Sequence, residues 1–200
     1  MHYAAAAGRD DVLAFLAAKR GRCRARSREG LTALHIAARS RSVPCATLLL
    51  AVGASVDDTD AAGETPLFNA VKNGDRSMMS LLLDNGADVD ARNAAGSSIM
   101  HLAAHHHCAL LLSALISRSP DMRTVDSAGN TALHIAAASA NLPFITECTH
   151  RIAFEQREQK NIMGLTPQDI IERGSCDLMR NASQEWEDRH RGMHGSHAPL

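Results

Sequence analysis

The chain has 200 residues, of which 45% are hydrophobic and 22% charged, so it can fold around a buried core. A net charge of −1 provides no overall attraction to nucleic acid or an anionic membrane, and 3% aromatic residues leave little surface for stacking bases. The five cysteines are far apart and form no C-x-x-C pair, which argues against a disulfide framework or a zinc ribbon. No apolar run approaches the roughly 18 residues that a membrane-spanning helix needs. We therefore expect a soluble cytoplasmic protein, with the nucleus as the alternative location.

One sequence pattern recurs along the chain. It begins with a truncated copy, "HYAAAAGRDDVLAFLA", from His2. Four fuller copies follow, with glycines 33 residues apart: REGLTALHIAA with Gly30, AAGETPLFNAV with Gly63, AAGSSIMHLAA with Gly96 and SAGNTALHIAA with Gly129. A fifth copy, IMGLTPQDII, has its glycine, Gly164, 35 residues further on. A fixed period of this length is typical of a solenoid built from stacked units.

Each copy carries the signals of helix ends. One position always holds a hydroxyl that can cap a helix N-terminus: Thr32, Thr65, Ser98, Thr131 and Thr166. Proline follows directly at Pro66 and Pro167, the first helical position, where a missing N–H does no harm. Gly53 and Gly86 follow leucine runs and predict the left-handed residue that ends a helix. Each unit therefore contains short helices, which are marginally stable alone and need stacking on their neighbours.

The unit resembles the ankyrin repeat, a β-turn followed by two antiparallel helices with T-P-L-H at the first helix. The resemblance implies an all-α solenoid in the following parts: a partial repeat (1–26), four repeats (27–59, 60–92, 93–125 and 126–160), a C-terminal cap (161–186) and a tail expected to be disordered (187–200). The glycine that ends the first helix of the unit is replaced by Arg41, His107 and Ala140 in three copies, and we expect strain there.

The stretch "MHLAAHHHCALLL", from Met100, is the only one that suggests chemistry. His101 falls on the repeat position of His2, His35 and His134, where the resemblance implies a bond to the Thr or Ser three residues earlier. A metal site is the alternative, because His101 and His105 share a helix face; the further ligands would come from His107, Cys108 or another repeat. We favour a polar contact surface, and we predict no metal, no cofactor and no catalytic residue. Cys108 and His107 are adjacent in sequence and point apart, so this is not predicted to be an enzyme.

The basic segment "KRGRCRARSRE", Lys19 to Glu29, has two interpretations. It suits a nucleic-acid or nuclear-import patch when taken alone. The repeat register places it instead against an acidic neighbour, with Arg24 one repeat before Asp57 and Arg26 beside Asp58. We favour this second interpretation, in which the charges align successive loops.

The resemblance implies non-catalytic binding of another protein through a concave groove and the loop tips, as an adaptor or scaffold. The expected contact residues are polar and offer little apolar anchor: Arg28, Arg39, Asp60, Lys72, Asn73, Arg92, Asn93, His105 and His106. Such a surface predicts moderate, salt-sensitive affinity, which changes between about pH 5.5 and 7.5 if the histidines contribute. The alternative is a regulatory segment of a larger enzyme or channel, because the chain starts inside a repeat.

Overall fold

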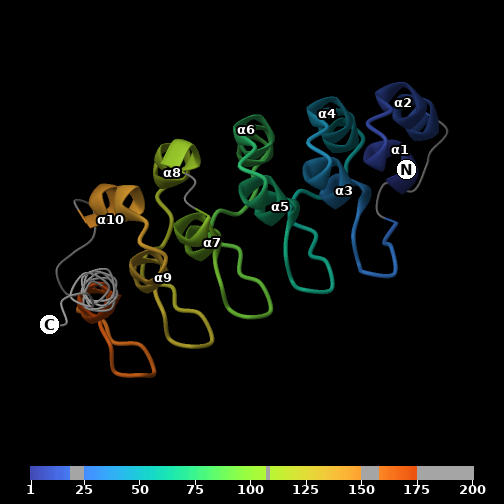
Figure 1. Cartoon of the computed structure of the whole chain (residues 1–200). Helices are drawn as coiled ribbons and strands as arrows, with labels where there is room; N and C mark the ends of the chain where they lie inside the picture. Colours follow the sequence, from blue (N-terminus) through green and yellow to red (C-terminus); the bar gives the residue numbers. More distant parts are fainter. Residues whose placement is uncertain (19–24, 107–108, 150–157, 175–200) are drawn as a thin grey trace, which may run out of the picture.

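The computed structural model describes residues 1–18, 25–106, 109–149 and 158–174. Pairs of short helices stack side by side, and the loop between successive pairs projects from the same side of the stack (Figure 1). The helices are α1 (His2–Ala6), α2 (Asp10–Ala18), α3 (Ala33–Arg39), α4 (Val43–Ala51), α5 (Pro66–Lys72), α6 (Arg76–Asp84), α7 (Ile99–His105), α8 (Ala109–Ile116), α9 (Ala132–Ala138) and α10 (Leu142–Thr149). A further helical stretch covers residues 167–174.

The helices begin where the capping signals predict. The N-cap residues of α3, α5, α7 and α9 are Thr32, Thr65, Ser98 and Thr131. Their extended backbone turns the chain from the preceding loop into the helix. Asp75 caps α6 through a bond from the Met78 N–H to its carboxylate.

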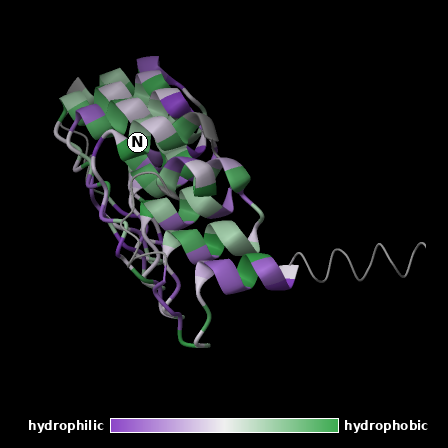
Figure 2. Cartoon of the chain, turned by 90° about the vertical axis from the view of Figure 1, so that its left-hand side faces the viewer, coloured by the Kyte–Doolittle hydropathy of each residue, from purple (hydrophilic) through white to green (hydrophobic). Residues whose placement is uncertain are grey.

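The core lies between the inner helices (α1, α3, α5, α7 and α9) and the outer helices, and it also joins neighbouring inner helices. Ala37, Ala38, Ala103 and Ala104 are fully or almost fully buried, because small side chains let adjacent helices approach closely. The helices carry most of the apolar colour, whereas the loops are more polar (Figure 2). No helix within the described residues is long and apolar enough to cross a membrane.

The predicted strain is present at two of the three substituted glycine positions. Arg41 has φ +58° and Ala140 has φ +52°, in the left-handed region that costs about 1–2 kcal/mol for a residue with a Cβ. His107 lies outside the described residues. Ser119, which occupies the position of Gly53 and Gly86 in the third repeat, also has a left-handed φ of +53°.

The loops, which we call fingers, are linked to one another by their backbones. The N–H of Ala61 donates to the carbonyl of Glu29 at 3.0 Å, and the N–H of Ala94 donates to that of Ala62 at 2.9 Å. A Cβ at Gly63 would lie 2.8 Å from the Ala94 nitrogen, so only glycine permits this approach. Arg26 forms an ion pair with Asp58 at 3.2 Å, as the repeat register predicts, whereas Arg24 lies outside the described residues.

Candidate functional site

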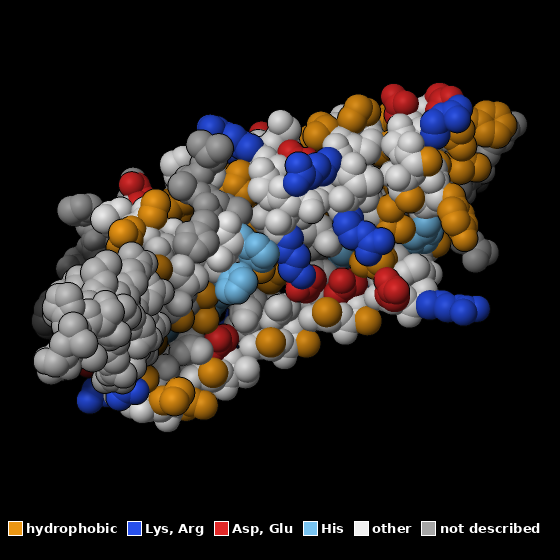
Figure 3. All heavy atoms as spheres, viewed as in Figure 1, with side chains coloured by type: hydrophobic (Ala, Val, Ile, Leu, Met, Phe, Trp, Pro, Cys, Tyr) orange, Lys and Arg blue, Asp and Glu red, His pale blue; other side chains and the backbone are white. Residues whose placement is uncertain are grey.

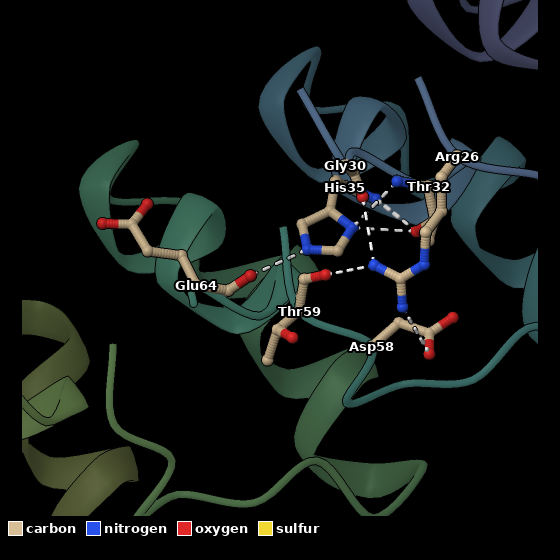
Figure 4. Close-up of polar contacts among 7 residues, drawn as sticks. All are labelled: Arg26, Gly30, Thr32, His35, Asp58, Thr59 and Glu64. Carbon is tan, nitrogen blue, oxygen red and sulfur yellow. Dashed lines mark hydrogen bonds and ion pairs between the residues drawn. The ribbon is translucent and has the colours of Figure 1, made fainter. Parts of the chain in front are cut away.

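A histidine bridge connects successive repeats, and the contact around His35 shows its geometry (Figure 4). The Nε2 of His35 bonds the Glu64 carbonyl of the next repeat at 2.9 Å. A carbonyl only accepts, so Nε2 carries the proton and Nδ1 is the acceptor of this neutral ring. The backbone N–H of Thr32 donates to that Nδ1 at 3.2 Å, and the Thr32 hydroxyl lies 2.8 Å from it.

The same bridge recurs at the other histidines of this register. His101 bonds Ser98 and the Asn130 carbonyl, and His134 bonds Thr131 and the Leu165 carbonyl. The structure thus confirms the predicted bond to the residue three positions earlier and adds the contact to the next repeat. Both ring nitrogens of His101 are engaged, so neither is open to a metal ion. The described residues contain no group of three potential metal ligands, and His107 and Cys108 lie outside them.

Burial lowers the pKa of each of these three histidines below the ordinary 6.5. The backbone carbonyl that each ring bonds acts in the opposite direction and raises the pKa. Protonation would place a second N–H at Nδ1, opposite the N–H of the capping residue. The rings are therefore structural groups that require the neutral form.

The second repeat departs from this pattern. Phe68 occupies the histidine position and is buried, and it can make neither of the two bonds. The hydroxyl of Thr65 is buried without a hydrogen-bond partner among the described residues, and so is the side-chain nitrogen of Asn69. Asn69 itself stands where other repeats have Ile36, Leu102 and Ile135. Phe68 thus lacks the bonds that histidine makes in the neighbouring repeats, and Asn69 places a polar amide where those repeats have an apolar side chain.

A pocket of about 190 Å³ lies next to this departure. Its walls come from the inner helices and from the finger before α7: Phe68, Leu102, Ile135, Asn93, Ser97, His101 and His105. We call the angle between the inner helices and the fingers the groove, and the pocket is part of it. Its lining combines apolar side chains with polar groups, a combination common in binding sites.

A row of basic side chains borders the groove. Figure 3 shows Lys, Arg and His side chains side by side over α3, α5 and α7, above acidic side chains on the fingers. Arg39, Lys72, His105 and His106 are exposed at the last turns of these helices. The rings of His105 and His106 meet edge to face, with centroids 5.0 Å apart. The pKa of His106 lies below its ordinary value because of partial burial and the nearby basic groups of His105 and Lys72.

Four of the nine predicted contact residues use their side chains within the fold. The carboxylate of Asp60 and the amide oxygen of Asn93 each accept two backbone N–H groups of their own finger. Asn73 donates to the carbonyls of Ala38 and Arg39 in the preceding repeat. Arg92 donates to the carbonyls of Gly96 and Val125, joining its finger to the next. These residues build and connect the repeats.

The other five present their charged or polar ends on the surface. Lys72 is paired with Glu64 at 2.6 Å and keeps a side-chain exposure of 38%. Arg28 and Arg39 are exposed, and their guanidinium groups have no hydrogen-bond partner among the described residues. Arg39, Lys72, His105 and His106 form the basic row, whereas Arg28 lies apart on the first finger. The structure therefore gathers four of the nine predicted residues at one edge of the groove.

A family model described as ankyrin repeats in three copies matches residues 1–93 and 67–148, which together cover most of the chain. The chain belongs to the ankyrin repeat family. Ankyrin repeats are typically non-catalytic and generally serve as protein–protein interaction modules. The paired helices and stacked fingers agree with this family.

The sequence predicts little apolar anchor in the groove of these ankyrin repeats; of the pocket lining it points to Asn93 and His105, but not to the apolar side chains. Phe68, Leu102 and Ile135 come from three successive repeats, so no local pattern brings them together. The sequence contains one indication of this pocket. The copy "TPLFNAV" has phenylalanine where four other copies have histidine, and a break in a repeat pattern often marks function.

Proposed function

We propose that this ankyrin-repeat chain is a non-catalytic adaptor or scaffold that binds a partner protein in its groove. The observation that supports this proposal is the basic row of Arg39, Lys72, His105 and His106 along the rim of the groove. Long or aromatic polar side chains aligned over successive inner helices offer one continuous contact surface. Arg28 extends the proposed contact surface on the first finger, and Asp60, Asn73, Arg92 and Asn93 support that surface by bonding the backbone of the fingers and helices.

The stacked repeats suit this role because they hold the surface rigid. Bonds between repeats connect neighbouring fingers and helices, as at His35 and Arg92. A preorganised surface loses little conformational entropy when a partner binds. We propose that the repeats span 27–59, 60–92, 93–125 and 126–160, with a cap at 161–186. We further propose that the protein is located in the cytoplasm or nucleus.

The charges on the groove rim predict the character of the binding. Exposed basic groups act mainly on the association rate and are screened by salt, so affinity falls as ionic strength rises. If His105 and His106 contribute to the contact, we expect the affinity for an acidic partner to increase as the pH falls from about 7.5 to 5.5. A flat affinity over that range would remove the two histidines from the contact.

Affinity capture from native lysate with mass spectrometry tests the proposal. The bait is the full chain, beside a variant with Lys72→Glu, His105→Glu and His106→Glu whose fold is verified by circular dichroism. These three side chains are exposed, so the variant should fold. A matched control carries the same substitution at three exposed outer-helix positions, Ser77→Glu, Thr47→Glu and Ser113→Glu.

A protein retained by the wild type and by the control, but lost by the groove variant, supports the proposal. Direct titration of that protein must then reproduce the loss. Equal capture by all three baits would place any partner elsewhere on the molecule and contradict the proposed role of the groove.

A further inference from the structure

The contact between the second and third repeats, which we call the seam, lacks the bridge that holds the other repeats together. Across it stand Phe68 from α5 and Ser97 from the finger before α7, and both line the pocket. The histidines of the first, third and fourth full repeats and His2 each reach a carbonyl of the next repeat. The Phe68 side chain has no N–H group that could donate to a carbonyl across the seam.

The Ser97 carbonyl at the seam can consequently accept one more hydrogen bond, as a comparison with the same carbonyl of two other repeats shows. The Glu64 carbonyl accepts two hydrogen bonds, from the Asp60 N–H at 3.0 Å and from His35 at 2.9 Å. The Asn130 carbonyl accepts from the Asp126 N–H and from His101 in the same way. The Ser97 carbonyl accepts only the Asn93 N–H, at 3.0 Å, from the described part of the chain. A carbonyl oxygen has two lone pairs, so one remains for an external donor.

The size and lining of the pocket fit one side chain. A buried cavity of about 150 Å³ holds a benzene ring, whereas sites for drug-sized ligands are about 300–1,000 Å³. The pocket of about 190 Å³ lies between these sizes and suits one aromatic ring. Phe68, Leu102 and Ile135 supply the apolar contact, and an aromatic side chain with an N–H or O–H at its tip would also satisfy a polar acceptor.

The charged side chains beside the pocket favour particular residues next to that aromatic ring in the partner. His105 lines the pocket and contacts His106, whose pKa is influenced by Lys72. Glu64 is an acidic group beside this row, and Lys72 pairs with it. Arg39 continues the basic row on α3. A carboxylate next to the aromatic residue would therefore meet basic side chains.

We propose that the pocket at the seam receives one Tyr or Trp side chain from an acidic segment of the partner protein, with the side-chain donor directed to the Ser97 carbonyl. This inference rests on the proposed function and specifies the chemistry that the groove recognises. The departure of the second repeat from the histidine pattern is then a feature of the binding site.

Selection from a phage library of short random peptides on the immobilised full chain tests this. The wild type should enrich Tyr or Trp over Phe at one position, with Asp or Glu beside it. Replacing that Tyr or Trp by Phe in a synthetic peptide should weaken binding about three- to tenfold, as expected for one hydrogen bond. Phe68→His, which restores the bridge and occupies the carbonyl, should weaken binding more than about tenfold. His105→Glu should remove the acidic preference and keep the aromatic one.

Two further variants keep the test decisive if Phe68→His fails to fold. Leu102→Gln alters the pocket lining, whereas Ile36→Gln alters the same repeat position away from the pocket. Loss of binding with Leu102→Gln and retention with Ile36→Gln is the expected result. The inference is overturned if no peptide is enriched, if Phe replaces Tyr or Trp without loss, or if a folded Phe68→His variant binds as the wild type does.

These outcomes separate the inference from the proposed function. Suppose that the Lys72, His105 and His106 variant loses a captured partner, while Phe68→His and Leu102→Gln bind peptides as the wild type does. The groove is then the binding site, and the proposed aromatic anchor is wrong. If the groove variant loses nothing as well, both proposals fail.

Discussion

Thr65 and Thr32 occupy the same repeat position and are both 2% exposed, but their hydroxyl groups differ in what they bond. The Thr32 oxygen lies 2.8 Å from Nδ1 of His35 and accepts the His35 backbone N–H at 3.4 Å. The Thr65 oxygen is buried with no hydrogen-bond partner among the described residues. Replacing each threonine by valine keeps the shape and removes the hydroxyl, so the two substitutions isolate this difference.

The expected effects have opposite signs. A buried polar group without a partner destabilises the folded state by about 1–3 kcal/mol, and valine removes that penalty. Thr65→Val should therefore raise the free energy of unfolding by about 1 kcal/mol after the lost capping preference is subtracted. Thr32→Val loses a cap and a hydrogen bond to the histidine, and should lower the free energy of unfolding by about 1–2 kcal/mol.

Urea denaturation followed by far-ultraviolet circular dichroism measures both changes. The midpoints of Thr65→Val and Thr32→Val should lie on opposite sides of the wild-type midpoint. Thr131→Val is the matched control, since the Thr131 hydroxyl lies 2.8 Å from Nδ1 of His134, and it should behave as Thr32→Val does. Equal losses at Thr65 and Thr32 would refute the assignment of an unsatisfied hydroxyl to the second repeat.

Further predictions follow from strain, burial and charge. Ala140→Gly should stabilise the fold by about 0.5–1 kcal/mol, because the left-handed backbone costs alanine more than glycine loses in entropy; an unchanged melting temperature would contradict this. Asn69→Leu should raise the free energy of unfolding by about 1 kcal/mol in urea denaturation by removing the unpaired amide nitrogen, and a loss would mean that this nitrogen has a partner in solution. Arg92→Ala should lower the melting temperature through the loss of two carbonyl contacts worth about 1 kcal/mol together, whereas Arg28→Ala should not change it. Stability should fall as the pH drops below 6.5, because the buried histidines have lowered pKa values and the unfolded chain binds protons more readily; urea midpoints from pH 7.5 to 5 that stay constant would exclude the required neutral form.

The sequence by itself determined the repeat, its helix starts and the left-handed turns. These features are local: a hydroxyl caps the helix that follows it, as at Thr32, and a residue in the helix-ending turn takes a positive φ, as Arg41 and Ala140 do. The pairing of Arg26 with Asp58 could also be predicted from the sequence, because residues one repeat apart in a solenoid lie next to each other in space.

Only the tertiary structure decided which polar residues are available to a partner. In the sequence, Asn73 and Arg92 look as suitable for binding as Arg39, but the fold uses their donors to join neighbouring repeats. Whether a long side chain turns to a carbonyl or to the surface depends on the geometry of the adjacent repeat, which the repeat's own residues do not specify.

The pocket is the clearest case of a feature that the tertiary structure alone reveals. Phe68 breaks the histidine pattern in the sequence, but its consequence depends on a carbonyl in the next finger and on side chains from two later helices. These groups are close only because the repeats stack in register. The physical reason is that hydrogen-bond capacity and free volume belong to the contact between repeats, whereas the residue pattern belongs to each repeat alone.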